Sequence, residues 1–257
     1  MKPFFRRSKH NLYSIIATGL LFFSFAAQAQ DSSTGSGRRL RNTVKFNITS
    51  PILYDNAFQF GYERVIGKHQ SINVFGGYNE FPLSLKLNLS NTAVTGSSDR
   101  SGYSCGVEYR FYLQKENKYE PPHGVFLAPY VSYYHFTGSK MLTHTDSTGP
   151  HTANLHTGIS FLNIGGTLGY QFVLWKRLTI DAVLFGPAVS HYNFKAAIDG
   201  SLGTINKDEA TEAVIDAIKE KFPLLDKLSG EHEVSGSGTQ NFWSAGFRYS
   251  ISIGFRF

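Results

Sequence analysis

The sequence has little cysteine, little charge and no long apolar run, and each shortage excludes a class of protein. Among 257 residues there is one cysteine, Cys105, which rules out an intrachain disulfide and a zinc site built from several thiolates. Charged residues make up only 17% of the chain, below the roughly 25% usual for soluble domains. No apolar run after the N-terminal region reaches the roughly 18 residues of a transmembrane helix, so a helical membrane protein is excluded.

The first 29 residues explain most of the net charge of +6. Four basic residues, Lys2, Arg6, Arg7 and Lys9, precede an apolar stretch from Ile15 to Ala26 and the small-x-small triplet Ala27-Gln28-Ala29. This order predicts a secretory signal peptide over residues 1–29, cleaved near Ala29. Without it the chain carries 21 basic and 19 acidic residues, so nucleic acid is not an expected partner. Residues 30–41, rich in Ser and Gly, predict a flexible linker.

The C-terminus alternates between large apolar and small or charged residues without a break for fifteen residues. One face carries Trp243, Phe247, Ile251 and Phe255, and the other carries Arg248 and the serines between them. A strand of a transmembrane barrel needs about 9–11 residues with alternate side chains facing lipid. The pattern therefore predicts a barrel strand that faces lipid on one side and the lumen on the other.

Seven further segments alternate in the same way, which makes eight strands. They begin near Thr43, Phe58, Ile72, Tyr103, Gly124, Leu162 and Leu178. The fifth is less regular because Tyr130 and Tyr134 fall opposite Leu127 and Val131, and the seventh is interrupted at Gly186-Pro187, a predicted bulge. The fold class predicted is all-β, an eight-stranded antiparallel up-and-down transmembrane barrel over residues 42–257.

Short and long connectors alternate, as the turns and outer loops of such barrels do. Short connectors follow strands two, four and six, and long ones span about 79–101, 137–159 and 195–240. Within the last, Asn206 precedes an amphipathic stretch at about 207–222 that ends at Pro223, so one helix is predicted there.

Seven charged residues are predicted to face the lumen, where a barrel of eight strands leaves room only for side chains. They are Lys45, Glu63, Glu108, Arg110, Asp181, Arg248 and Arg256. Because buried charges need partners, we expect Lys45 to pair with Glu63 and Asp181 with Arg256, and Arg248 to compete for Glu108. The alternative is a narrow path for ions.

Catalytic and metal sites have weaker support. His144, His151 and His156 lie with Asp146 in a predicted polar loop at irregular spacing, so no metal site is expected. Ser190-His191, and Ser132 with His135, lie at the depth where a lipid-modifying enzyme would act. Adjacent residues of a strand point to opposite faces, so Ser190 and His191 should not meet. We predict no catalytic residues and no cofactor, and Cys105 is expected to be an inert thiol on the lipid side.

The last residues, Tyr249, Ile251, Ile253, Phe255 and Phe257, resemble the C-terminal signal that barrel-assembly machinery recognises. Further motifs resemble a family of small, uncharacterised outer-membrane barrels of Gram-negative bacteria; they are Leu53-Tyr54-Asp55, Phe60-Gly61-Tyr62-Glu63, Ser71–Asn79, Val107–Tyr112 and Gly169–Phe172. The likeness covers most of residues 42–194 and omits the loop with the predicted helix. It implies location and fold, and no catalytic residue.

The sequence thus predicts an outer-membrane barrel with a structural or surface-interaction role and a lumen filled by paired charges. Its expected partners are membrane lipid, lipopolysaccharide, the assembly machinery and an unidentified ligand or protein at the surface. Trp175 on the turn side, and Tyr78 and Trp243 toward the outside, are expected at the membrane interfaces. The competing hypotheses are an enzyme that modifies lipid A and a narrow channel for small solutes.

Overall fold

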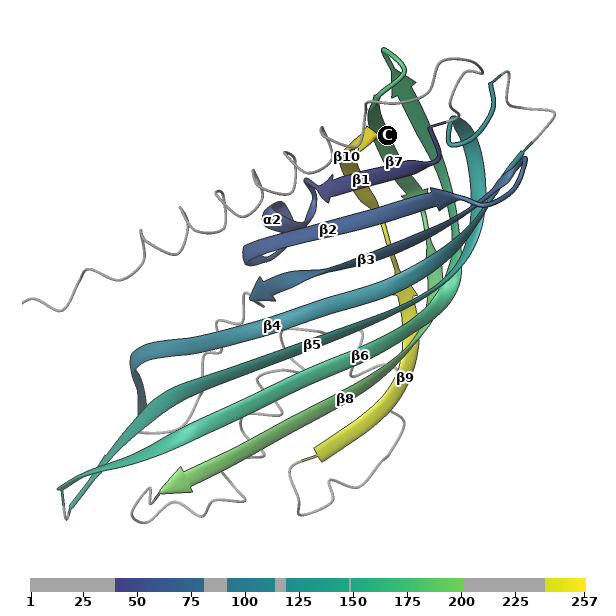
Figure 1. Cartoon of the computed structure of the whole chain (residues 1–257). Coiled ribbons are helices and arrows are strands. Elements are labelled where there is room, and N and C mark those ends of the chain that lie inside the picture. The colour runs from purple at the N-terminus through teal and green to yellow at the C-terminus, as the bar shows by residue number, and fades with distance from the viewer. Residues whose placement is uncertain (1–39, 81–91, 114–118, 148, 201–238) are drawn as a thin grey trace, which may run out of the picture. The chain divides into compact units, whose positions relative to one another are not determined.

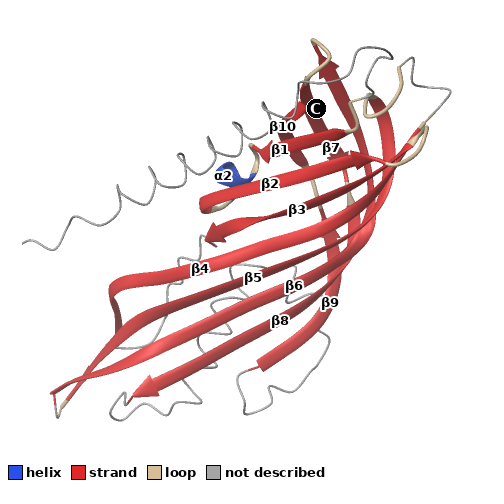
Figure 2. Cartoon of the chain, viewed as in Figure 1, coloured by secondary structure: helices blue, strands red, loops and turns tan. Residues whose placement is uncertain are grey.

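The computed structural model describes residues 40–80, 92–113, 119–147, 149–200 and 239–257, and almost all of them lie in strands (Figure 2). The strands are β1 (Asn42–Asn47), β2 (Asp55–Val65), β3 (Gln70–Glu80), β4 (Thr92–Tyr112), β5 (Gly124–Asp146), β6 (Gly149–Leu174), β7 (Leu178–Phe185), β8 (Pro187–Gly200), β9 (Thr239–Phe247) and β10 (Ser250–Arg256). The helix α2 spans Ser50–Leu53. No helix within the described ranges is long and apolar enough to cross a bilayer. The predicted signal peptide and the helix predicted at 207–222 lie outside the described residues.

Residues 41–256 form one compact unit in which the sheet closes on itself. Eight antiparallel strands make the ring, in the order β1, β2, β3, β4, β5, β6, β7, β10, and β10 returns to β1. The strands β8 and β9 continue β7 and β10 past breaks at Gly186 and at Arg248-Tyr249, and they pair with each other. The eight-stranded up-and-down barrel is therefore confirmed, and so is the interruption predicted at Gly186-Pro187.

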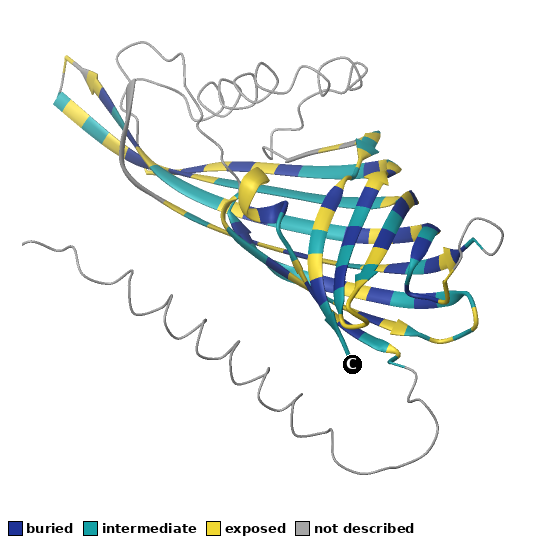
Figure 3. Ribbon diagram, turned by 90° about the horizontal axis from the view of Figure 1, so that it is seen from above, coloured by how far each residue is buried: buried dark blue, intermediate teal, exposed yellow. Residues whose placement is uncertain are grey.

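Alternate side chains point outward and inward along the strands, as the bands of buried and exposed residues in Figure 3 show. Large apolar residues are exposed on the outer face of every strand of the ring; examples are Phe46, Phe60, Val74, Val107, Leu127, Ile164, Leu184 and Ile253. The inner face is mostly polar in β1, β2 and β3, where Lys45, Gln59, Glu63 and Asn73 are buried beside the one large apolar side chain, Phe75. Tyr130 and Tyr134 point inward and line the lumen, which explains the irregular alternation of β5.

The two ends of the barrel differ. The connectors at 66–69 and 175–177 are short turns, and the C-terminal end of β10 lies beside the second of them, because the Arg256 amide donates to the Arg177 carbonyl oxygen at 2.7 Å. At the other end β4, β5, β6 and β8 run well past β2 and β3 (Figure 1). The long loop expected at 137–159 is wrong: β5 and β6 stay paired out to Asp146 and Gly149. Apolar and polar residues alternate less regularly in this hairpin, so the sequence pattern did not indicate that the two strands continue.

Glycines make room for rings inside the lumen. A Cβ atom at Gly106 would clash with the Phe75 ring, and one at Gly169 with the Phe126 ring. Both aromatic rings are buried among the inward-facing side chains. Small residues on the inner face therefore leave space for these large rings, because an eight-stranded barrel has little interior volume.

Among the described residues, the barrel wall is incomplete between β9 and β2. The Asn47 side-chain oxygen accepts the amides of Thr49 and Ser50 at 2.9 and 3.2 Å, and Pro51 follows at the start of α2. An asparagine turn and a proline, which has no N–H for a strand ladder, both favour leaving the sheet here. As a result β1 ends at Asn47, and among the described residues β9 pairs only with β8.

Candidate functional site

Six charged side chains from five parts of the ring meet inside the lumen, and we call them the charge layer. They are Lys45 of β1, Glu63 of β2, Glu108 and Arg110 of β4, Asp181 of β7, and Arg248 between β9 and β10. Each comes from an inward position of the period-two pattern, so closing the ring brings them together. Arg248 has the most exposed side chain of the six, at 13%.

Opposite charges alternate through this layer. The Lys45 Nζ atom lies 2.5 Å from the Glu63 Oε2 atom and also binds the Asp181 carboxylate. Arg110 places Nη1 2.5 Å from Asp181 Oδ2 and Nη2 2.5 Å from Glu108 Oε2. Arg248 binds the other oxygen of Glu108. The three cations and three anions balance, which is what makes their burial tolerable.

Neutral groups complete the layer. The Gln171 Oε1 atom accepts from Lys45 at 3.0 Å, from Arg110 at 3.1 Å and from Tyr112 at 3.1 Å. Tyr112 and Ser71 both donate to Glu63, at 2.7 and 2.5 Å. Sequence reasoning missed these three residues because uncharged polar side chains occupy many inward positions, and only the closed ring shows which of them reach the charges.

Aromatic rings cover the guanidinium groups on the layer's two sides. The Arg110 guanidinium carbon lies 4.2 Å from the centre of the Phe126 ring. That of Arg248 lies 4.5 Å from Phe75 and 5.1 Å from Tyr130. Such stacking stabilises a desolvated cation.

The ion pair expected between Asp181 and Arg256 is wrong. Asp181 binds Lys45 and Arg110, not Arg256. Arg256 lies nearer the turn end, opposite Thr43 of β1, and it donates to the Pro121 carbonyl oxygen at 3.3 Å. Lys45 with Glu63, and Arg248 with Glu108, are the partners that the sequence suggested.

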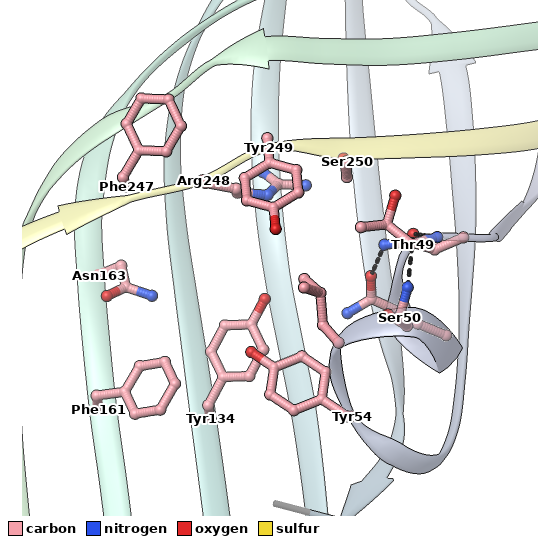
Figure 4. Close-up of a pocket in the computed structure, with 13 residues that line it drawn as sticks. Thr49, Ser50, Tyr54, Tyr134, Phe161, Asn163, Phe247, Arg248, Tyr249 and Ser250 are labelled. Carbon is pink, nitrogen blue, oxygen red and sulfur yellow. Dashed lines mark hydrogen bonds between the residues drawn. The ribbon is translucent and has the colours of Figure 1, made fainter. Parts of the chain in front are cut away.

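Two small cavities in the lumen are lined by described residues. One, of about 20 Å³, lies against the charge layer between Lys45, Phe75 and Arg248. This is room for about one water. The other, of about 100 Å³, lies beside α2 at the gap in the wall, and we call it the side cavity (Figure 4).

The side cavity is bounded by rings and hydroxyl groups. Tyr54 stacks on Phe136 at 5.7 Å between ring centres, and Tyr134 stacks on Phe161 at 4.8 Å. Figure 4 shows the hydroxyl groups of Tyr54, Tyr134 and Tyr249 directed into the space between β10 and α2. The sequence places Tyr54 in a connector, and only the course of α2 turns this ring into the barrel.

The serines and histidines considered for catalysis lie on different faces. The Ser190 hydroxyl donates to Asn163 inside the lumen at 2.6 Å, and the Asn163 amide donates to Ser132 at 3.1 Å. His191 instead packs on Trp243, with ring centres 4.7 Å apart, and His135 packs between Tyr103 and Tyr133. Within the described part of the chain, Ser190 forms no hydrogen bond with His191, and Ser132 forms none with His135. Activation of a serine nucleophile by a histidine requires such a hydrogen bond.

The histidines of the predicted outer loop lie in the β5–β6 hairpin. His144 is buried opposite His151, and His156 lies 3.5 Å from Asp199 of β8. Within the described residues, no group of three or more metal-binding side chains occurs. Cys105 is exposed on the outer face of β4.

The residues predicted at the interfaces and at the C-terminus are placed as follows. Trp175 lies in the β6–β7 turn and is 85% exposed, and Trp243 of β9 is 59% exposed. Tyr78 of β3 stacks on Phe58 and donates to Glu80. Tyr249, Ile251 and Ile253 are exposed on the outer face, Phe255 is half-buried at the end of β10, and Phe257 is the last residue.

Comparison with known proteins gives a family and a distant structural likeness. Residues 16–202 match the family described as "Protein of unknown function (DUF3575)". No curated protein matches the chain. Among solved structures, a major outer membrane protein from Thermus thermophilus is similar at 11% identity and a TM-score of 0.37, over 84% of this chain and 98% of that one.

Proposed function

The chain belongs to the DUF3575 family of proteins of unknown function, and from that premise we propose that it is an outer-membrane barrel closed to solutes. In this proposal the barrel has a structural or surface-interaction role, and the signal peptide is removed near Ala29 during export from the cytoplasm of a Gram-negative cell. Its surroundings are membrane lipid and lipopolysaccharide, and the assembly machinery recognises its last residues.

The observation that carries the proposal is the outer face of the ring. Large apolar side chains on that face stay exposed, with fractions of 48% at Phe60, 52% at Ile164 and 45% at Ile251. Soluble monomers rarely expose a contiguous apolar patch larger than a few hundred Å². Charges lie inside and apolar groups outside, the reverse of a soluble protein, so hydrocarbon is the solvent that suits this surface.

The interior supports a closed barrel. The charge layer spans the ring from β1 to β7, and the cavity beside it has room for about one water. Beyond this layer the long ends of β4, β5, β6 and β8 extend the sheet (Figure 1). We assign the surface-interaction role to these extended strands.

Fractionation with heat-modifiable gel mobility tests the membrane position. We expect the chain in the outer-membrane fraction, with a gel band whose mobility changes on boiling, because a closed barrel resists detergent at room temperature. Recovery in the soluble periplasmic fraction would overturn the proposal.

A single variant makes the same experiment sharper. Ile251→Lys places a charge on the outer face, where lysine at mid-membrane costs about 2–4 kcal/mol. The folded band should then be lost at lower temperature than in the unchanged protein. In a soluble barrel the same side chain, 45% exposed, would face water and lysine would be tolerated.

A further inference from the structure

The side cavity connects the lumen with the outer surface of the barrel. Three of the residues that line it, Leu53, Phe247 and Tyr249, are also 39%, 58% and 50% exposed. They stand on the two sides of the gap, since Leu53 belongs to α2 and the other two to the β9–β10 strand. We call these three residues the side opening.

The side opening lies beside the outer apolar face. Tyr249, which directly precedes β10, is followed on the same face by Ile251 and Ile253 of β10, which are 45% and 44% exposed. In a membrane barrel, a strand edge that faces hydrocarbon has unpaired backbone groups, and such an edge is tolerated only where it lines a cavity or is covered. The side opening has such an edge, so it suits a molecule that enters the lumen from the membrane and covers the edge.

The hydrogen-bond donors of the side cavity select the ligand. Of the thirteen residues that line it, Arg248 alone carries a formal charge, and none is acidic. Arg248 uses its Nη1 atom for Glu108, and a guanidinium has five N–H donors in all. The phenol groups of Tyr54, Tyr134 and Tyr249 face the same space (Figure 4), so the cavity offers donors to an anionic, acceptor-rich group.

The size of the cavity limits how much of a ligand it can hold. Its volume of about 100 Å³ is five times that of the cavity beside the charge layer, which has room for about one water. Sites for whole drug-sized molecules have about 300–1,000 Å³. The cavity therefore fits a small head group, and a long apolar tail would have to leave through the side opening.

We propose that the side cavity binds the carboxylate of a long-chain fatty acid, with Arg248 and Tyr134 as the donors and the acyl chain passing between Leu53 and Tyr249 into the membrane. This inference goes beyond the proposed function and rests on its membrane position alone. A planar carboxylate matches the guanidinium fork, and a single chain needs only a narrow exit.

Binding of hexadecanoate to the full-length, folded chain in detergent tests the proposal. Native mass spectrometry should show one bound hexadecanoate and much weaker binding of hexadecanol, which has the same chain without the charge. Equal binding of the two would overturn the proposal. Tighter binding of hexadecyl phosphate than of hexadecanoate would overturn the choice of a carboxylate.

Variants locate the site. Arg248→Gln should weaken hexadecanoate binding about tenfold or more, because a charge-assisted bond is lost, and Tyr134→Phe should weaken it by about two- to tenfold. Leu53→Trp should also weaken binding by filling the side opening. Tyr103→Phe is the matched control, since Tyr103 lies on the outer face beside Tyr133 and His135.

The readouts separate this inference from the proposed function. Each variant is first checked for heat-modifiable mobility, so a failure to fold is not mistaken for a loss of binding. Should Arg248→Gln not fold, Tyr134→Phe and Leu53→Trp decide the test. Binding that is the same in these two variants as in Tyr103→Phe would refute the site, while the barrel's membrane position would stand.

Discussion

Gly169 shows how the inside of a narrow barrel depends on single atoms. A Cβ atom on this glycine would lie 2.4 Å from the Phe126 ring, which is fully buried, and 2.6 Å from the Ala182 carbonyl oxygen. Gly166, three residues earlier on β6, has open space where a Cβ atom would stand. The two glycines thus differ in packing although they belong to the same strand.

We expect Gly169→Ala to destabilise the barrel by about 1–3 kcal/mol, because an added methyl group overpacks a filled interior. Gly166→Ala, the matched control, should change stability by less than about 0.5 kcal/mol. The temperature at which the folded gel band disappears measures both. Equal shifts in the two variants would show that packing against Phe126 is not the cause.

At the scale of the elements, the charge layer joins strands that are not neighbours in the ring. Arg110 of β4 binds Asp181 of β7, and Lys45 joins β1 to both β2 and β7. Backbone hydrogen bonds connect each strand only to its neighbours in the ring. The layer therefore holds opposite walls of the barrel at a fixed distance.

Lys45→Met should destabilise the barrel by about 3–5 kcal/mol, because Glu63 and Asp181 would remain buried with less positive charge between them. Arg100→Met serves as the control, since Arg100 pairs with Asp55 where the side chains are 28% and 50% exposed. An exposed pair contributes about 0–1 kcal/mol. Urea unfolding in lipid vesicles compares the two, and similar losses would mean that the layer is not what holds the walls.

At the scale of the whole molecule, the proposed closure to solutes depends on what fills the middle of the ring of eight strands. The charge layer occupies the lumen, and about 20 Å³ remains beside it. The alternative hypotheses of a solute channel and of a lipid-modifying enzyme find no supporting geometry among the described residues, since the serines considered face the lumen and the histidines beside them pack on outer aromatic rings.

We expect no discrete conductance steps when the folded protein is added to planar lipid bilayers. Ions would have to displace buried pairs, and breaking such a pair costs several kcal/mol. The same preparation after boiling controls for effects of detergent. Steps of constant size from the folded protein alone would contradict a closed lumen.

The sequence by itself determined which side chains face outward and which face the lumen. Period two is a local property of an extended chain, so Ile251 and Arg248 could be assigned to opposite faces without knowing any partner strand. The connector lengths could not show how far β5 and β6 continue, because the hairpin from Thr137 to Ile159 is polar and its pairing depends on the neighbouring strands.

Only the tertiary structure decided which lumen residues meet and where the wall opens. The partner of Asp181 across the ring depends on the stagger between strands, and stagger is fixed when β10 closes against β1. The gap beside β9 depends in turn on α2, a single turn of helix that directs Tyr54 inward. Contacts across a closed ring are long-range, so no local pattern in the chain encodes them.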